Sequence, residues 1–181
     1  MKELSLHILD VVQNSIAAGS KLIKINIIED LDADKFTIEI TDDGCGMDKD
    51  YADKIKDPFT TGRKSRRVGL GIPLLYAAGK RCEGDLEITS EKGKGTKVTV
   101  WMKRSHIDRA PLGDMAETIK TLIVCNPDVD FNYKHILNKK EFNFETKEIK
   151  RILGDVPINE MDVLSWIEGY IKEGLKSLME V

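Results

Sequence analysis

The chain begins with a pattern of apolar and polar residues that predicts an amphipathic helix over residues 4–18. Its apolar stripe recurs at spacings of three and four and consists of Leu4, Ile8, Val11 and Val12. Gly19 comes next as the expected stop. The opposite stripe carries His7, Asp10 and Asn14, and such stripes are usually solvated faces. Asn is unfavourable inside a helix, however, and small residues come after Asn14, so this stripe is a candidate site.

Strict alternation of apolar and polar residues continues in two segments, residues 23–27 and 36–40. Alternation predicts strands with one buried face, and their short polar connection predicts an antiparallel hairpin. The same reasoning extends along the first hundred residues. There it predicts a short helix, a loop, a second helix and two more strands, at residues 48–56, 57–67, 68–81, 86–88 and 98–102.

The pattern breaks near Asp108 to Pro111, where we expect a boundary between domains at 1–105 and 106–181. The second part is predicted to contain a helix, a hairpin turning at Asn138-Lys139, and two more helices. Their expected ranges are 114–124, 131–137, 141–145, 146–153 and 160–179. The apolar stripe of the last helix has two interpretations: it packs on the first domain, or it makes a homodimer or partner contact.

Composition narrows the class of protein. The 181 residues are 41% hydrophobic and 33% charged with a net charge of −3, which is typical of a soluble globular protein and gives no reason to expect nucleic-acid binding. No apolar run approaches the about 20 residues of a membrane span, and the start is unlike a signal peptide. Three scattered cysteines suit neither a disulfide framework nor a zinc site, so we expect a cytoplasmic protein without membrane partners.

The run Asp42 to Met47 is the strongest single candidate for a binding site. Asp42 ends a predicted strand and can accept a hydrogen bond from an exocyclic amine, and Gly44 and Gly46 let the backbone approach a planar ligand. Asp-Asp-Gly is also ordinary turn chemistry, so this run alone leaves both interpretations open.

A second candidate combines a basic loop with a helix start. The loop holds Thr, Ser and Gly and ends in a cluster of cations, and it leads directly into Gly69-Leu70-Gly71. A glycine-containing helix N-terminus presents free N–H groups and the positive end of the helix dipole. The pair is therefore a candidate clamp for a polyphosphate.

Four signals in order resemble the ATP-binding domain of the gyrase, heat-shock chaperone, histidine kinase and MutL superfamily, the GHKL ATPases. They are Asn14, Asp42-x-Gly44-x-Gly46, Gly69-x-Gly71 and Gly93-x-Gly95-Thr96. The resemblance covers residues 3–103, and the stretch from Val68 to Met102 is particularly similar to sensor histidine kinases. It implies an α+β fold of the Bergerat type: a two-layer α/β sandwich with a mixed, mostly antiparallel sheet, helices on one face, and here a C-terminal α/β extension.

The resemblance also implies roles for individual residues. Asn14 would ligate Mg²⁺, Asp42 would bind the adenine amine, Thr96 would support that contact through water, and Asp10 would be catalytic. The residues implied to contact ATP or ADP are Asn14, Asp42, Gly44, Gly46, Met47, Thr60, Thr61, Arg63, Lys64, Arg67, Gly69, Leu70, Gly71 and Thr96.

Two departures from the family pattern bear on the expected chemistry. Asp10 stands where hydrolysing members have a glutamate, so its reach toward an attacking water is shorter, and Arg67 replaces a glycine. We expect no upstream hairpin with a phospho-accepting histidine, and His7 is expected to have a site-lining or structural role. A kinase of this kind would phosphorylate a partner protein in trans, as the similar anti-sigma-factor kinases do.

Three functions are consistent with these residues. The first is a Mg-dependent ATP-binding protein with ATPase or protein-kinase activity. The second is an ATP-gated interaction module with little or no turnover, in which nucleotide orders the loop and creates a partner surface. The third is a small α/β domain whose glycines serve only turns.

Overall fold

The structure, a computed structural model, describes residues 3–57 and 70–180. Within these ranges the elements are, in order, α1 (Leu4–Ala17), β1 (Leu22–Asp30), β2 (Lys35–Asp42), α2 (Lys49–Lys54), α3 (Gly71–Arg81), β3 (Asp85–Glu91), β4 (Gly95–Lys103), α4 (Met115–Cys125), β5 (Asp130–Leu137), β6 (Lys140–Glu145), α5 (Thr146–Leu153) and α6 (Met161–Met179). Each predicted helix and strand corresponds to one of these elements, with small shifts at the ends. None of the helices in these ranges is long and apolar enough to cross a membrane.

All of these strands form one sheet in the order β3-β4-β2-β1-β5-β6. Neighbouring strands are antiparallel except β1 and β5, which run parallel. The chain reaches β5 through α4, as a parallel pairing requires, because two parallel strands need a crossover connection. The sheet is therefore mixed and mostly antiparallel, as predicted.

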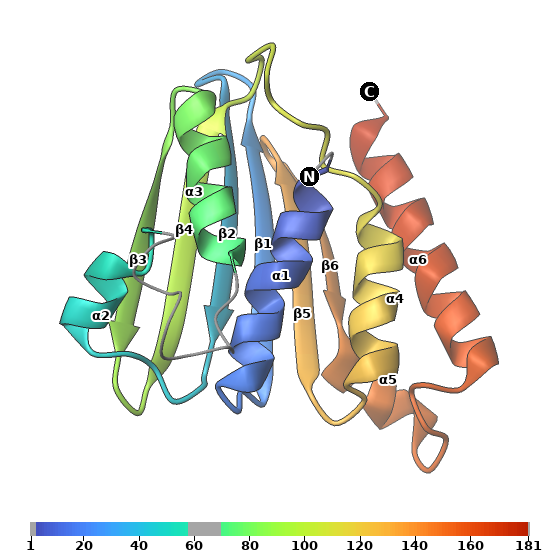
Figure 1. The fold of residues 1–181 in the computed structure, drawn as a ribbon. Coiled ribbons are helices and arrows are strands. Elements are labelled where there is room, and N and C mark those ends of the chain that lie inside the picture. The colour runs from blue at the N-terminus through green and yellow to red at the C-terminus, as the bar shows by residue number, and fades with distance from the viewer. Residues whose placement is uncertain (1–2, 58–69, 181) are drawn as a thin grey trace.

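The helices lie in one layer in front of this sheet (Figure 1). The alternation of β1 explains why. Ile23, Ile25 and Ile27 point toward the helices and are fully buried, whereas Lys24 on the opposite face is exposed. Burying apolar side chains contributes about 25 cal/mol per Å² of apolar surface, so the sheet gains stability by keeping its apolar face under the helices. This confirms the predicted α+β fold with one covered face.

The segment after residue 106 continues the same sheet. Strand β5 pairs with β1 along its whole length, and Tyr133 lies opposite Ile25. The apolar stripe of α6 buries Ile167, Ile171 and Leu178, and the main contacts of this helix are with α4, β5 and β6. The interpretation that the stripe packs on residues 1–105 is therefore wrong, because its main partners lie in the C-terminal part of the chain. The division of the chain at residues 105 and 106 stays a prediction.

A buried ionic group joins the two parts of the chain. Glu29 on β1 accepts a hydrogen bond from Nε of Arg104 at 2.6 Å and another from Nε2 of His135 at 2.8 Å. The other ring nitrogen of His135 lies 3.2 Å from the hydroxyl of Tyr133. Burial alone would raise the pKa of Glu29, but the hydrogen bonds from His135 and Arg104 outweigh burial and lower this pKa.

Candidate functional site

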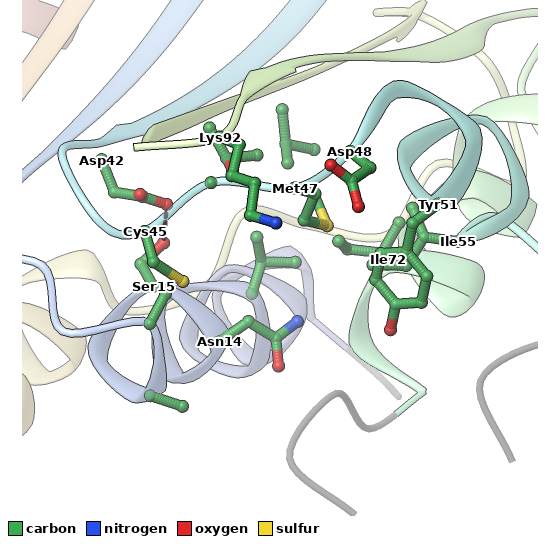
Figure 2. A pocket seen from close by; sticks show the side chains of 16 residues that line it. Asn14, Ser15, Asp42, Cys45, Met47, Asp48, Tyr51, Ile55, Ile72 and Lys92 are labelled. Carbon is green, nitrogen blue, oxygen red and sulfur yellow. Dashed lines mark hydrogen bonds between the residues drawn. The ribbon is translucent and has the colours of Figure 1, made fainter. Parts of the chain in front are cut away.

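A cavity of about 420 Å³ opens beside the C-terminal half of α1. Figure 2 shows Asp42 and Ser15 at one end and Tyr51 at the other, with Met47 and Lys92 between them. The walls come from α1, the loop after β2, α2, the start of α3 and the β3–β4 hairpin. They consist of Val11, Asn14, Ser15, Ala17, Ala18, Asp42, Cys45, Gly46, Met47, Asp48, Tyr51, Ile55, Ile72, Lys92, Thr96 and Val98. Mostly apolar walls with a few convergent polar groups are typical of small-molecule sites.

Asp42 is held in place at the last position of β2. One carboxylate oxygen accepts a hydrogen bond from the Ser15 hydroxyl at 2.6 Å, and the other accepts one from the backbone N–H of Gly44 at 2.9 Å. Each carboxylate oxygen has a second acceptor position, so the group can still accept a donor from the cavity. The arrangement suits recognition of an amino group on a planar ligand.

Thr96 lies beside Asp42 because the register of β2 and β4 places the two residues opposite each other. Its hydroxyl is 2.8 Å from the hydroxyl of Ser90, which also accepts the backbone N–H of Met47 at 2.8 Å. Ser90 thereby ties the loop after β2 to the β3–β4 hairpin. No sequence motif pointed to Ser90, although the register of the hairpin places it opposite Thr96.

Gly44 and Gly46, in the loop after β2, have a packing role that the sequence pattern did not predict. A Cβ on Gly44 would lie 2.7 Å from Oγ of Ser20, and one on Gly46 would collide with the carbonyl oxygen of Glu91. Gly46 also has a φ of +68°, which is unfavourable for other residues. Gly46 lines the cavity, but Gly44 packs against the end of α1 and is not among the lining residues.

Beside the cavity, α1 meets the start of α3. Nδ2 of Asn14 is buried and has no hydrogen-bond partner within the described part of the chain. One turn earlier, Asp10 contacts the start of α3, since a Cβ on Gly71 would lie 3.0 Å from that of Asp10. Leu70 is 54% exposed, and neither Leu70 nor Asp10 lines the cavity.

No side chain of residues 3–57 or 70–180 caps the N-terminus of α3. Its first backbone N–H groups lack intrahelical partners, as they do in every helix. Together with the dipole of the helix they would favour an anionic group in this position.

Several predicted residues lie outside the part of the chain that the structure describes. The predicted roles of Thr60, Thr61, Arg63, Lys64, Arg67 and Gly69 therefore stay predictions.

His7 has a different position from the one its place in the helical stripe suggested. It is buried between α1 and α3 and lines a separate cavity of about 80 Å³ with Cys82 and Arg81. Burial lowers the pKa of the imidazole, and the nearby positive charge of Arg81 lowers it further against the opposing effect of Asp10. The neutral form is therefore favoured.

Some lining residues carried no motif that sequence reasoning could use. Ser15 comes directly after Asn14 and was seen only as a small residue, and Tyr51 and Ile55 form one face of the short helix α2 and its end. Lys92 and Cys45 belong to the two turns that close the cavity. Only their side-chain directions in the folded chain bring them together.

The side chains around the cavity could hold a divalent metal ion only if that ion is also bound to a phosphate. Across residues 3–57 and 70–180, no three His, Cys, Asp or Glu side chains cluster as a metal site. Asn14 nevertheless fits a phosphate-bound Mg²⁺, because its amide oxygen is a hard ligand and its unpartnered Nδ2 can donate to a phosphate oxygen. Mg²⁺ at such sites takes few protein ligands and keeps several waters.

Comparison with solved structures shows the fold. The crystal structure of the N-terminal domain of a DNA repair protein superimposes with a TM-score of 0.53 at 17% identity, covering 79% of this chain and 52% of that one. With that coverage, the likeness extends beyond residues 3–103, which carry the predicted motifs.

Comparison with known sequences shows the family. The model of histidine kinase-, DNA gyrase B- and HSP90-like ATPases matches residues 2–106. Sporulation kinase E of Bacillus subtilis (strain 168) is 38% identical over 69 residues, covering 38% of this chain and 9% of the kinase. A putative sensor protein of Shewanella frigidimarina (strain NCIMB 400) is 33% identical over 99 residues, covering 54% of this chain and 15% of that protein. The chain thus spans only a small part of the length of these relatives. It belongs to the histidine kinase-, DNA gyrase B- and HSP90-like ATPases, the GHKL superfamily, and carries an ATP-binding, kinase-like domain.

Proposed function

We propose that this cavity binds the adenine of ATP and that Mg²⁺ and the phosphates lie toward the start of α3. The observation that carries the proposal is the carboxylate of Asp42, oriented by Ser15 and Gly44 in a mostly apolar cavity. Its free acceptor positions match the exocyclic amine of adenine. Thr96, whose hydroxyl lies 2.8 Å from that of Ser90, would support this contact through a water.

The geometry of α1 and α3 supports the proposed position of the phosphates. Asn14 would ligate Mg²⁺ and donate to a phosphate, and the N-terminus of α3 would stabilise the negative charge. Bound Mg²⁺ would neutralise charge that develops on the phosphates during transfer. Asp10, one turn before Asn14, would accept the proton of the attacking group, either water or a side chain of a partner protein.

The reaction proposed is therefore hydrolysis of ATP, or transfer of its γ-phosphoryl group to a partner protein in trans. The second candidate, an ATP-gated module with little or no turnover, is favoured by one observation: Asp10 is one methylene shorter than the glutamate of hydrolysing members. The cytoplasmic location expected from the cysteines stays a prediction.

Alkylation of Cys45 tests occupancy of the cavity. Cys45 is exposed and lines the cavity, Cys125 is exposed at the end of α4, and Cys82 is buried. Saturating ATP with Mg²⁺ should slow alkylation of Cys45 by about tenfold or more, since a bound ligand buries most of its own surface against the cavity walls. Peptide mass spectrometry of iodoacetamide-treated protein measures both rates in one sample.

Cys125 is the internal control for this measurement, because ATP should leave its rate unchanged. A Cys45→Ser variant should bind ATP normally by calorimetry, which would show that the thiol only reports on the cavity. If millimolar ATP changes neither the Cys45 rate nor the heat signal, the proposed site is wrong.

Replacing Asp10 with Asn separates the two candidate functions. An enzyme that uses this carboxylate as a base should lose about a hundredfold in phosphate release and keep its affinity for ATP, because Asn cannot accept the proton. Phosphate release by wild-type and variant protein, together with calorimetry, measures both quantities. Equal rates near the background would favour the gated module.

A further inference from the structure

Helix α6 forms one flank of the helical layer (Figure 1). Its inner face packs on the sheet, and one side is joined to α4 by the ion pair between Glu168 and Lys120 at 2.7 Å. Within the described residues, no helix lies on its outer side (Figure 1). The outer side of α6 is therefore open to another molecule.

Five residues of α6 make a continuous outer line, which we call the α6 seam. They alternate at spacings of four and three residues, and all of them are exposed: Asp162, Trp166, Gly169, Glu173 and Lys176. This spacing keeps the five side chains on one narrow face of the helix, opposite the face that buries Ile167 and Ile171. One of the five, Trp166, is a large aromatic residue among polar and small neighbours.

The aromatic residue of the α6 seam is supported from below. The ring of Trp166 is 54% exposed and stacks on Tyr170 with centroids 5.1 Å apart and an interplanar angle of 14°. Tyr170 in turn contacts the rings of Phe142 and Phe144 on β6. The stack holds Trp166 in a defined position, so it presents a preformed apolar surface to a partner, as interface aromatics do.

The α6 seam is complementary to itself. Gly169 is its midpoint, with Asp162 seven residues before and Lys176 seven residues after. Turning a second copy by half a turn about an axis through Gly169 places each Asp162 across from the Lys176 of the other copy. A Cβ at Gly169 would meet no atom within 4 Å, so the backbones can approach closely there.

We propose that the α6 seam is an interface between two copies of this chain, with the two α6 helices antiparallel and crossing at Gly169. A twofold interface requires one patch to fit itself, and a helix with an acidic start, a basic end and a glycine midway satisfies that condition. In this arrangement the Trp166 ring of one copy lies across from Lys172 and Glu173 of the other. The proposal concerns a different face from the ATP cavity and does not depend on it.

Charge reversal of the full chain tests the antiparallel pairing. In sedimentation velocity over a range of concentrations, Asp162→Lys or Lys176→Asp alone should weaken dimerisation about tenfold or more, since each change turns two attractions into two repulsions. The double variant should restore it. A wild-type protein that stays monomeric, or a double variant as weak as either single one, would overturn the proposal.

Cysteine cross-linking tests the crossing point independently of the charges. In a background with Cys45→Ser and Cys125→Ser, Gly169→Cys should form a disulfide-linked dimer under mild oxidation, because the two positions meet on the axis. Ser177→Cys is the matched control, since its two copies would lie about 24 Å apart along the helices. Equal cross-linking of both variants would show that collisions rather than the α6 seam produce the dimer.

Discussion

Replacing Asp42 with Asn is expected to lower the affinity for ATP about a hundredfold, or about 2–3 kcal/mol. In the wild-type protein both carboxylate oxygens accept hydrogen bonds, from Ser15 and from the backbone of Gly44. The Asn side chain has one oxygen and one NH₂ group in place of the two carboxylate oxygens. Its NH₂ would face either the Gly44 N–H or Ser15 and the adenine amine. In both orientations two hydrogen-bond donors would face each other. Calorimetric titration with ATP and ADP measures the loss.

The adjacent carboxylate provides a matched control. Asp43 accepts the backbone N–H groups of Lys21 and Leu22 at 2.8 and 3.0 Å, and it does not line the cavity. Burial would raise the pKa of Asp43, but these backbone hydrogen bonds outweigh burial and lower it. Asp43→Asn should therefore leave ATP affinity unchanged. Retained affinity in Asp42→Asn would remove Asp42 from the adenine role.

The second large effect is expected from the buried ionic group. Replacing Glu29 with Ala should lower the free energy of unfolding by about 3–5 kcal/mol, because it leaves His135 buried without its partner and opens a small cavity. Glu29 is only 5% exposed, so water cannot readily take its place. Urea denaturation at neutral pH measures the difference, with an unchanged m-value showing that the native state persists.

A further variant, Glu29→Gln, distinguishes charge from packing. Glu29→Gln keeps the size of the side chain and should cost less than Ala. Because the folded pKa of Glu29 is lowered, its ionic contribution is present above the unfolded pKa and is lost as pH falls through the folded value. The difference between wild type and Glu29→Gln should thus shrink toward acid pH.

Glu39→Ala is the control on the open face of the sheet. Its ion pair with Lys97, at 3.5 Å, is partly exposed, and such pairs contribute about 0–1 kcal/mol. If Glu29→Ala costs no more than Glu39→Ala, the buried group does not stabilise the fold in the way described.

Local patterns were sufficient to predict the elements of this fold. The alternation of Ile23, Ile25 and Ile27 specifies a strand with one buried face whatever lies above it, and the stripe of α1 specifies an amphipathic helix. The short connection between β1 and β2 makes them an antiparallel hairpin. Such features depend on residues close in the chain, so the sequence pattern contains them.

The pairing of β5 with β1 could not be predicted in the same way. No pattern in residues 130–137 indicates which strand they will pair with, because every strand carries the same backbone N–H and C=O groups. The position of Glu29 shows the consequence. In the sequence it is one charge at the end of an alternating segment, and only the arrival of His135 and Arg104 makes it a buried, paired group.

The residues of the candidate site also fall into two groups, those that a local motif predicted and those that only the folded chain brings together. Asn14, Asp42 and Thr96 were found because family motifs name their types and spacing, whereas Ser15, Ser90 and Cys45 carry no such signal. Type and spacing along a chain are local properties. Which hydroxyl reaches a carboxylate, or which backbone oxygen excludes a Cβ at Gly46, depends on segments that meet only after folding, and packing between distant segments sets those distances.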